Sequence, residues 1–163
     1  GPAGEKLVRF ANVMTGVKLA RRFLRAMLDR NSGRVIFISS ECAMRPIPHM
    51  IAYSMTKAAQ VNVTRGLAEL TKGTRVTVNS VLPGPTMTEG VVKYMEGYAK
   101  ENNIATVDEA IADYFAKNET TSLLQRFAAP EEIAHVTLFL CTQQAVVING
   151  AAQMAEGGVI RHV

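Results

Sequence analysis

A tyrosine and a lysine spaced four residues apart carry the strongest chemical signal in this sequence, Tyr53 and Lys57. On a helix, side chains four positions apart lie on the same face, within reach of each other. A phenol whose pKa is about 10 is a poor acid or base near neutral pH. A neighbouring ammonium favours the phenolate and lowers that pKa. The pair therefore predicts proton transfer at Tyr53, assisted by Lys57.

A serine that precedes Tyr53 by 13 positions (53 − 40) supplies a second chemical group, the Ser40 hydroxyl. Held near a carbonyl oxygen, it would orient the carbonyl and stabilise the alkoxide that develops as hydride reaches the carbon. Tyr53 would donate its proton to the same oxygen. Ser39 is expected only to support Ser40. Cys42 suggests a nucleophile, but we expect it to be a small buried hydrophobe, the usual role of a free cysteine.

The elements that must position these groups alternate between helix and strand, which is typical of a parallel α/β sheet. Periodicity and turn residues predict helices over residues 11–30 and 50–71, a helix that opens at 130–132, and strands at 35–38, 75–81 and 151–155. Four consecutive apolar residues at 35–38 predict a buried strand covered by helices on both faces.

Helix 50–71 is predicted to bury one stripe of apolar side chains and to turn Tyr53 and Lys57 away from it. The members of this stripe are Met55, Ala59, Val63, Leu67 and Leu70.

The strand at 75–81 is followed by Leu82-Pro83-Gly84-Pro85, where we expect the chain to leave the sheet because proline lacks an amide donor. In open parallel sheets, ligands bind outside the carboxyl ends of the strands. Ser40 and the Pro83-Gly84 turn should therefore face one crevice.

A long, polar and irregular helical segment at 86–127 is predicted to be a substrate lid, because connections of this length are often lids or binding loops. Its apolar side chains indicate either an apolar substrate or packing within the lid itself. They are Met87, Val91, Val92, Met95, Tyr98, Tyr114 and Phe115. His49 is a further candidate for the wall of the substrate crevice.

Composition predicts one globular domain over residues 1–163, since 48% of the residues are hydrophobic and 20% are charged. No apolar run approaches the roughly 18 residues of a membrane span, and residues 1–6 do not resemble a signal peptide, so we expect a cytoplasmic protein. Neither the two cysteines nor His49, His135 and His162 have metal-ligand spacing, and no metal is expected.

A net charge of +4 raises the question of a nucleic-acid partner, because basic residues gather in the segment 18–34. Helical spacing places Val17, Ala20 and Leu24 on one face and Lys18, Arg22 and Arg25 on the opposite one. No aromatic residue interleaves the charges, so a solvated helix face is the better interpretation. We expect no nucleic-acid partner.

The order of these motifs resembles the short-chain dehydrogenase/reductase family over nearly the whole chain. The matching segments are Asn12-Val13-Met14-Thr15-Gly16, residues 33–40, residues 52–59 and residues 78–86. The resemblance implies a Rossmann-like parallel sheet with flanking helices, NAD or NADP as cofactor, and a small carbonyl or alcohol substrate. It also implies homodimers or homotetramers that associate through the helices at 11–30 and 50–71.

The resemblance assigns roles position by position. It implies that Tyr53 is the acid–base residue and also contacts the cofactor, and that Lys57 is the group that binds the nicotinamide ribose. It implies that Ser40 is the substrate-orienting hydroxyl and Asn12 the proton-relay asparagine. The loop that would contact the nicotinamide carboxamide contains Pro83, Gly84, Thr86 and Thr88.

One departure from the family is large: neither a G-x-x-x-G-x-G fingerprint nor an Asn-Asn-Ala-Gly segment occurs in the sequence. In the family these motifs belong to the first strand–helix units, which cradle the cofactor pyrophosphate. The sequence therefore predicts the C-terminal catalytic half of the fold, lacking its nucleotide-binding units and with one sheet edge bared. The alternative is a catalytically inactive truncated domain that acts as an interaction module.

Overall fold

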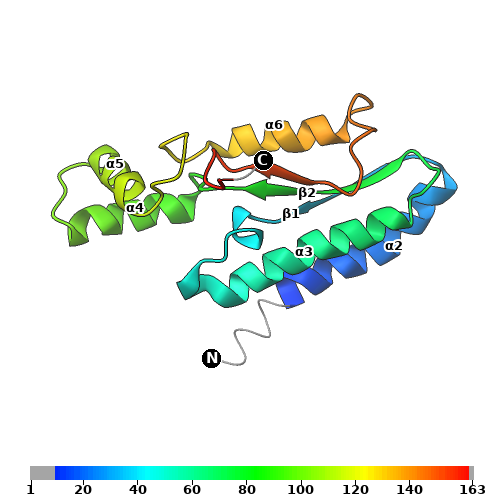
Figure 1. The fold of residues 1–163 in the computed structure, drawn as a ribbon, viewed down its shortest axis with the longest axis horizontal. Helices are drawn as coiled ribbons and strands as arrows, with labels where there is room; N and C mark the ends of the chain where they lie inside the picture. The colour runs from blue at the N-terminus through cyan, green and yellow to red at the C-terminus, as the bar shows by residue number, and fades with distance from the viewer. Residues whose placement is uncertain (1–9, 162–163) are drawn as a thin grey trace.

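The computed structural model describes residues 10–161, which form a parallel sheet with helices on both faces (Figure 1). The strands β1 (Gly33–Ile38), β2 (Val76–Pro83) and β3 (Ala152–Ala155) lie in the order β1-β2-β3. Helices α2 (Thr15–Asp29) and α3 (Ile51–Glu69) cover one face, and α6 (Pro130–Cys141) covers the other. The α/β, Rossmann-like fold is confirmed, while His162 and residues 1–6 of the sequence predictions lie outside the described residues.

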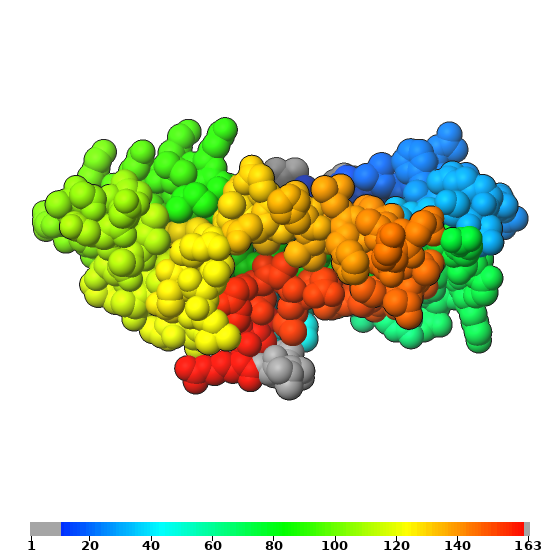
Figure 2. Space-filling model, turned by 90° about the horizontal axis from the view of Figure 1, so that it is seen from above, coloured from blue at the N-terminus to red at the C-terminus, as the bar shows by residue number. Residues whose placement is uncertain are grey.

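The remaining elements are short or belong to residues 86–127, the segment predicted to be a lid and called the lid below. A π-helical segment η1 (Phe10–Met14) leads into α2, and two single turns, η2 (Glu41–Ala43) and η3 (Pro48–Met50), connect β1 to α3. The segment 86–127 contains α4 (Glu89–Glu101) and α5 (Val107–Lys117). In Figure 2 the lid gathers at one end of the molecule and α2 lies at the opposite end.

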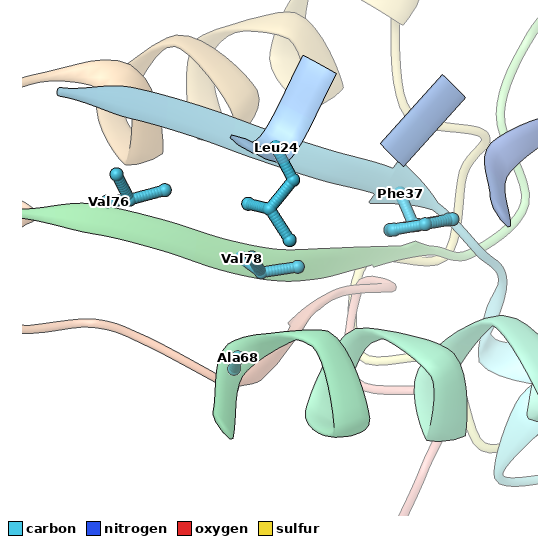
Figure 3. Close-up of a cluster of buried hydrophobic side chains, with 5 residues drawn as sticks. All are labelled: Leu24, Phe37, Ala68, Val76 and Val78. Atoms are coloured by element: carbon cyan, nitrogen blue, oxygen red, sulfur yellow. The ribbon is translucent and has the colours of Figure 1, made fainter. Parts of the chain in front are cut away.

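The core lies between the sheet and the pair α2 and α3 (Figure 3). It is built from one side chain of α2, one of β1, one of α3 and two of β2, namely Leu24, Phe37, Ala68, Val76 and Val78. β2 pairs with β1 on one side and β3 on the other, and nearly all of its residues are buried. Burial of these apolar side chains supplies the main stabilising free energy of this layer.

Strand β1 is less buried than its four apolar residues predicted. Phe37 is buried, but Val35 and Ile36 are half-buried and Ile38 is 47% exposed. Among the described residues β1 pairs with β2 alone, so its other edge is bare, as the absent strand–helix units led us to expect. Beside it, a groove of about 240 Å³ runs between β1 and α2.

Strand β2 continues through Pro83, two residues beyond its predicted end. The amides of Ser80 and Gly84 donate to carbonyls of the β3 segment, whereas the carbonyl of Val81 accepts from Ser39 on the β1 side. Because bonding sides alternate along a strand, the missing amide of Pro83 falls on the β1 side, where β1 has already ended. The proline therefore costs no hydrogen bond of the sheet.

The prediction of an apolar stripe on α3 is wrong at both ends of the stripe. Met55 and Leu70 are 44% and 61% exposed, and only Val63 and Leu67 pack against the core. The side chains that α3 buries are mostly polar, namely Ser54, Thr56, Lys57, Gln60, Thr64 and Ala68. Hydrogen bonds to neighbouring elements satisfy most of these polar groups, which is what makes their burial tolerable.

The lid has a core of its own. Met95 and Ala99 of α4 pack with Ala110 and Phe115 of α5 and with Phe127. Of the two interpretations of its apolar side chains, packing within the lid therefore accounts for most of them.

The orientation of α2 agrees with its periodicity. Ala20 and Leu24 are buried, while Arg21, Arg22 and Arg25 are exposed. None of the helices that the structure describes is long and apolar enough to cross a membrane.

Replacing Leu82 by alanine should lower the free energy of unfolding by about 2–5 kcal/mol, because the side chain is 1% exposed in the central strand and its loss leaves a cavity. Leu138→Ala is the matched control, since Leu138 is 62% exposed on α6 and should change stability by about 0.5 kcal/mol or less. Urea denaturation measures both. Equal losses in the two variants would contradict the assignment of the core.

Candidate active site

Ser40 stands where β1 ends and the chain turns into η2. Its backbone is extended and its Oγ accepts a hydrogen bond from the Cys42 amide at 3.2 Å. The neighbouring Ser39 donates from its Oγ to the carbonyl of Lys57 at 2.8 Å, while its amide bonds the Val81 carbonyl. Ser39 thus fastens the end of β1 to both β2 and α3, which fixes the position of Ser40.

Lys57 reaches from α3 back to the same strand end. Its Nζ donates to the carbonyl of Ile38 at 2.9 Å, and the side chain is largely buried. The Nζ atom also lies over the ring of Tyr53, 5.3 Å from its centroid. The ammonium and the phenol ring are therefore close neighbours, as the spacing predicted.

The pKa of Tyr53 moves opposite to our expectation. Burial raises it above its ordinary value, and a hydrogen bond with Ser40 offsets this only in part. Burial also lowers the pKa of Lys57. The predicted lowering of the phenol pKa by Lys57 is wrong for these residues, because desolvation of the phenolate is the largest effect. Tyr53 is thus held as a neutral phenol near neutral pH.

A cleft of about 440 Å³ brings most of the predicted site residues together. Those that line it are Ser40, Tyr53, Lys57, Pro83, Gly84, Thr86 and Thr88. Sequence reasoning missed Pro130 and Ile133 at the start of α6, which complete the wall; only their position after the lid could have indicated this. The described residues that line the cleft include one cation, Lys57, and no carboxylate.

The loop between β2 and α4 is held rigidly at the mouth of this cleft. Gly84 lies so close to β3 that an added Cβ would come within 2.5 Å of the Glu156 carbonyl oxygen, so a side chain does not fit there. Thr86 donates to the Gly84 carbonyl at 2.9 Å and forms a parallel bridge with Ala128. Thr88 caps α4 by accepting a hydrogen bond from the Val91 amide.

Asn12 lies apart from the residues that line the cleft, on η1. Its Nδ2 donates to Thr56 Oγ1 at 3.0 Å, and its carbonyl accepts from Gln60 Nε2. Thr56 in turn donates to the carbonyl of Tyr53 at 2.7 Å. Asn12 is therefore joined to the segment of α3 that carries Tyr53 and Lys57, and sequence reasoning missed Thr56 and Gln60 as its partners.

A second pocket, of about 340 Å³, adjoins the lid, and we call it the distal pocket. Residues 45–50 form one side of it, and Tyr94, Tyr114, Asn118 and Glu119 form the other. His49 lines this pocket rather than the cleft of Ser40 and Tyr53.

Cys42 is buried, as expected, and burial raises the pKa of its thiol. No group of described residues is arranged to hold a metal ion.

The chain is similar to known oxidoreductases along most of its length. It is 56% identical over 150 residues to the uncharacterized oxidoreductase YvrD of Bacillus subtilis, which covers 92% of this chain and 57% of that protein. It is 35% identical over 147 residues to 2-(S)-hydroxypropyl-CoM dehydrogenase 3 of Xanthobacter autotrophicus, covering 90% of this chain and 54% of that protein. The chain thus spans little more than half the length of these relatives.

A solved structure has the same fold. The L-sorbose reductase of Gluconobacter frateurii, crystallised with NADPH and L-sorbose, superimposes with a TM-score of 0.90 at 27% identity, over 100% of this chain and 60% of that one. The family model described as enoyl-(acyl carrier protein) reductase matches residues 7–160. With the fold, the motif order and these matches in agreement, the chain belongs to the short-chain dehydrogenase/reductase family of oxidoreductases.

Proposed function

We propose that this chain is the catalytic half of an NAD(P)-dependent oxidoreductase that interconverts a carbonyl compound and an alcohol. The observation that carries the proposal is the meeting of Ser40, Tyr53 and Lys57 with the Pro83–Thr88 loop in one cleft. These groups come from three separate elements, so their convergence is a property of the fold and not of sequence proximity.

The cleft suits the nicotinamide and ribose end of the cofactor. An ammonium has three donors, and Lys57 uses one on the Ile38 carbonyl, which leaves others for ribose hydroxyls. Thr86 and Thr88 offer hydroxyls for the nicotinamide carboxamide, and the described lining residues include no carboxylate to repel its carbonyl oxygen. A bound nicotinamide would supply or accept the hydride. NADPH in the similar L-sorbose reductase supports this assignment without deciding between NAD and NADP.

In the direction of reduction, the chain's own residues handle the carbonyl oxygen. Ser40 donates a hydrogen bond to it, which withdraws charge from the carbon. As the carbon gains hydride, the oxygen takes a proton from the Tyr53 hydroxyl, so one hydride and one proton convert the carbonyl to the alcohol. Burial keeps Tyr53 protonated and ready to donate. Asn12, linked through Thr56 to α3, is proposed to take part in returning the proton.

We also propose a cellular location and an oligomeric state for the protein. We infer a cytoplasmic homo-oligomer that associates through α2 and α3, where α3 exposes the apolar side chains of Ile51 and Met55. We favour this function over an inactive interaction module, because the similar Bacillus subtilis and Xanthobacter autotrophicus proteins are named as oxidoreductases and Ser40, Tyr53 and Lys57 line one cleft.

Replacing Tyr53 by phenylalanine should lower kcat by about 10²–10⁴-fold, the usual contribution of a positioned proton donor. The measurement needs the complete polypeptide that carries this sequence, with NADH or NADPH affinity followed by fluorescence. Cofactor affinity should stay unchanged, because the aromatic ring remains. Tyr98→Phe is the control, since Tyr98 bonds Asp113 within the lid and should leave kcat unaltered. Normal turnover in the Tyr53 variant would overturn the assignment.

Replacing Ser40 by alanine should raise the pKa of Tyr53 further, because the Ser40 hydrogen bond stabilises the phenolate and lowers that pKa. Alcohol oxidation needs the Tyr53 phenolate, so the increase in oxidation rate with rising pH should occur at higher pH in the variant. Tyrosinate absorbance in alkaline titration, taken as the difference from a Tyr53→Phe background, reports the pKa directly. Ser32→Ala, at an exposed turn, is the control. A pKa that falls or stays fixed in the Ser40 variant would contradict the proposed contact.

A further inference from the structure

The distal pocket lies one helical turn from the proposed catalytic cleft along α4, and it also adjoins the start of α3. Val91 of α4 lines the cleft and Tyr94, three residues later, lines the distal pocket. Met50 lines the distal pocket and Tyr53, three residues later, lines the cleft. Side chains three positions apart on a helix are neighbours. A substrate whose carbonyl lies at Ser40 and Tyr53 can therefore extend along α4 into the distal pocket.

The distal pocket combines several kinds of polar group with the aromatic rings of Tyr94 and Tyr114. Tyr94 and Tyr114 pack edge to face with ring centroids 6.1 Å apart. His49 and Asn118 add groups that can both donate and accept hydrogen bonds. Burial and the nearby Glu119 carboxylate raise the pKa of Tyr114 to about 12, so its phenol stays protonated. This mixture of donors and acceptors over apolar ring faces suits a chain of hydroxyl groups.

The charges of the distal pocket disfavour an anionic ligand. Arg45 is the only lysine or arginine among its described lining residues. Its Nη2 donates to both carboxylate oxygens of Glu119, at 3.0 and 2.8 Å, and lies 3.8 Å from Glu41 Oε1. Glu119 and Glu41 are both buried. Glu119 thus already engages this guanidinium through both of its oxygens. A phosphate or carboxylate on the ligand would face the Glu119 carboxylate, and the described lining residues offer no lysine or second arginine to balance it.

We infer that the substrate is a polyol or the matching hydroxylated carbonyl compound, and that the distal pocket binds its uncharged hydroxyl chain through Asn118, His49 and Tyr94. The inference rests on the proposed function and narrows it to one substrate class. It assigns specificity to residues that the proton-transfer step does not use.

The test compares three linear substrates in the complete polypeptide with NAD⁺ and NADP⁺: a hexitol, the same hexitol carrying a 6-phosphate, and 2-hexanol. We expect kcat/KM for the hexitol to exceed both others by about 10²-fold or more, because a pocket built for hydroxyl groups rejects analogues that lack them. A preference for 2-hexanol or for the phosphate would overturn the inference while leaving the proposed oxidoreductase intact.

Two asparagines give a matched pair of variants. Asn102 and Asn118 each follow a lid helix and donate from Nδ2 to the carbonyl four residues earlier, but Asn118 alone of the two lines the distal pocket. Asn118→Ala should raise KM for the hexitol about tenfold and leave that for 2-hexanol unchanged. Asn102→Ala should change neither. Equal effects on the two substrates, or from the two variants, would contradict the inference.

Binding provides a readout that does not need turnover. Saturation-transfer NMR of the hexitol should show contact with the wild-type protein and with Asn102→Ala, and a weaker signal with Asn118→Ala. Absence of hexitol binding to the wild-type protein overturns the inference. Binding that depends on Asn118, with no oxidation of any of the three substrates, supports the pocket and overturns the proposed function instead.

Discussion

A reciprocal pair of hydrogen bonds between β1 and α3 sets the geometry on which the site depends. Lys57 Nζ donates to the Ile38 carbonyl at 2.9 Å, and Ser39 Oγ donates to the Lys57 carbonyl at 2.8 Å. Together they fasten the helix that carries Tyr53 to the strand end that carries Ser40. Bonds to a charged donor in a buried setting are stronger than neutral ones, and leaving either partner unpaired there would be costly.

The same constraint explains why α3 buries polar side chains where its sequence predicted an apolar stripe. Thr56 accepts a hydrogen bond from the Asn12 side chain and Gln60 donates one to the Asn12 carbonyl, while Thr64 donates to the Gln60 carbonyl. Ala68, with Val63 and Leu67 packed beside it, joins the apolar core from the second half of the helix. The first half of α3 thus positions the site residues and the second half contributes to the apolar core. The hydrogen-bond network offsets the free-energy cost of burying the polar side chains of the first half.

The lid adds a separate constraint, because it packs mainly on itself. Its core unites α4, α5 and Phe127, while the ion pair of Arg45 with Glu119 joins its end to the segment that follows β1. A lid with its own core can present Val91 to the cleft and Tyr94 to the distal pocket without unfolding. In the proposed function, substrate selection can therefore rest on the lid while proton transfer rests on α3 and the end of β1.

The sequence by itself determined the α/β fold, the order of its elements, and the cluster of Ser40, Tyr53 and Lys57. These follow from local periodicity, from turn residues, and from the rule that parallel strands end at one edge of a sheet. Position-by-position resemblance added the Pro83–Thr88 loop, and the cleft contains it.

Only the tertiary structure decided the rest: the polar buried face of α3, the extension of β2 through Pro83, the raised pKa of Tyr53 and the placement of His49 in the distal pocket. Each depends on which elements pack together, because burial and hydrogen-bond partners are long-range properties. Asn12 and Thr56, for example, are 44 residues apart in sequence and 3.0 Å apart in space. No local pattern of residue types encodes such a contact, since it arises only when the helices and strands share one core.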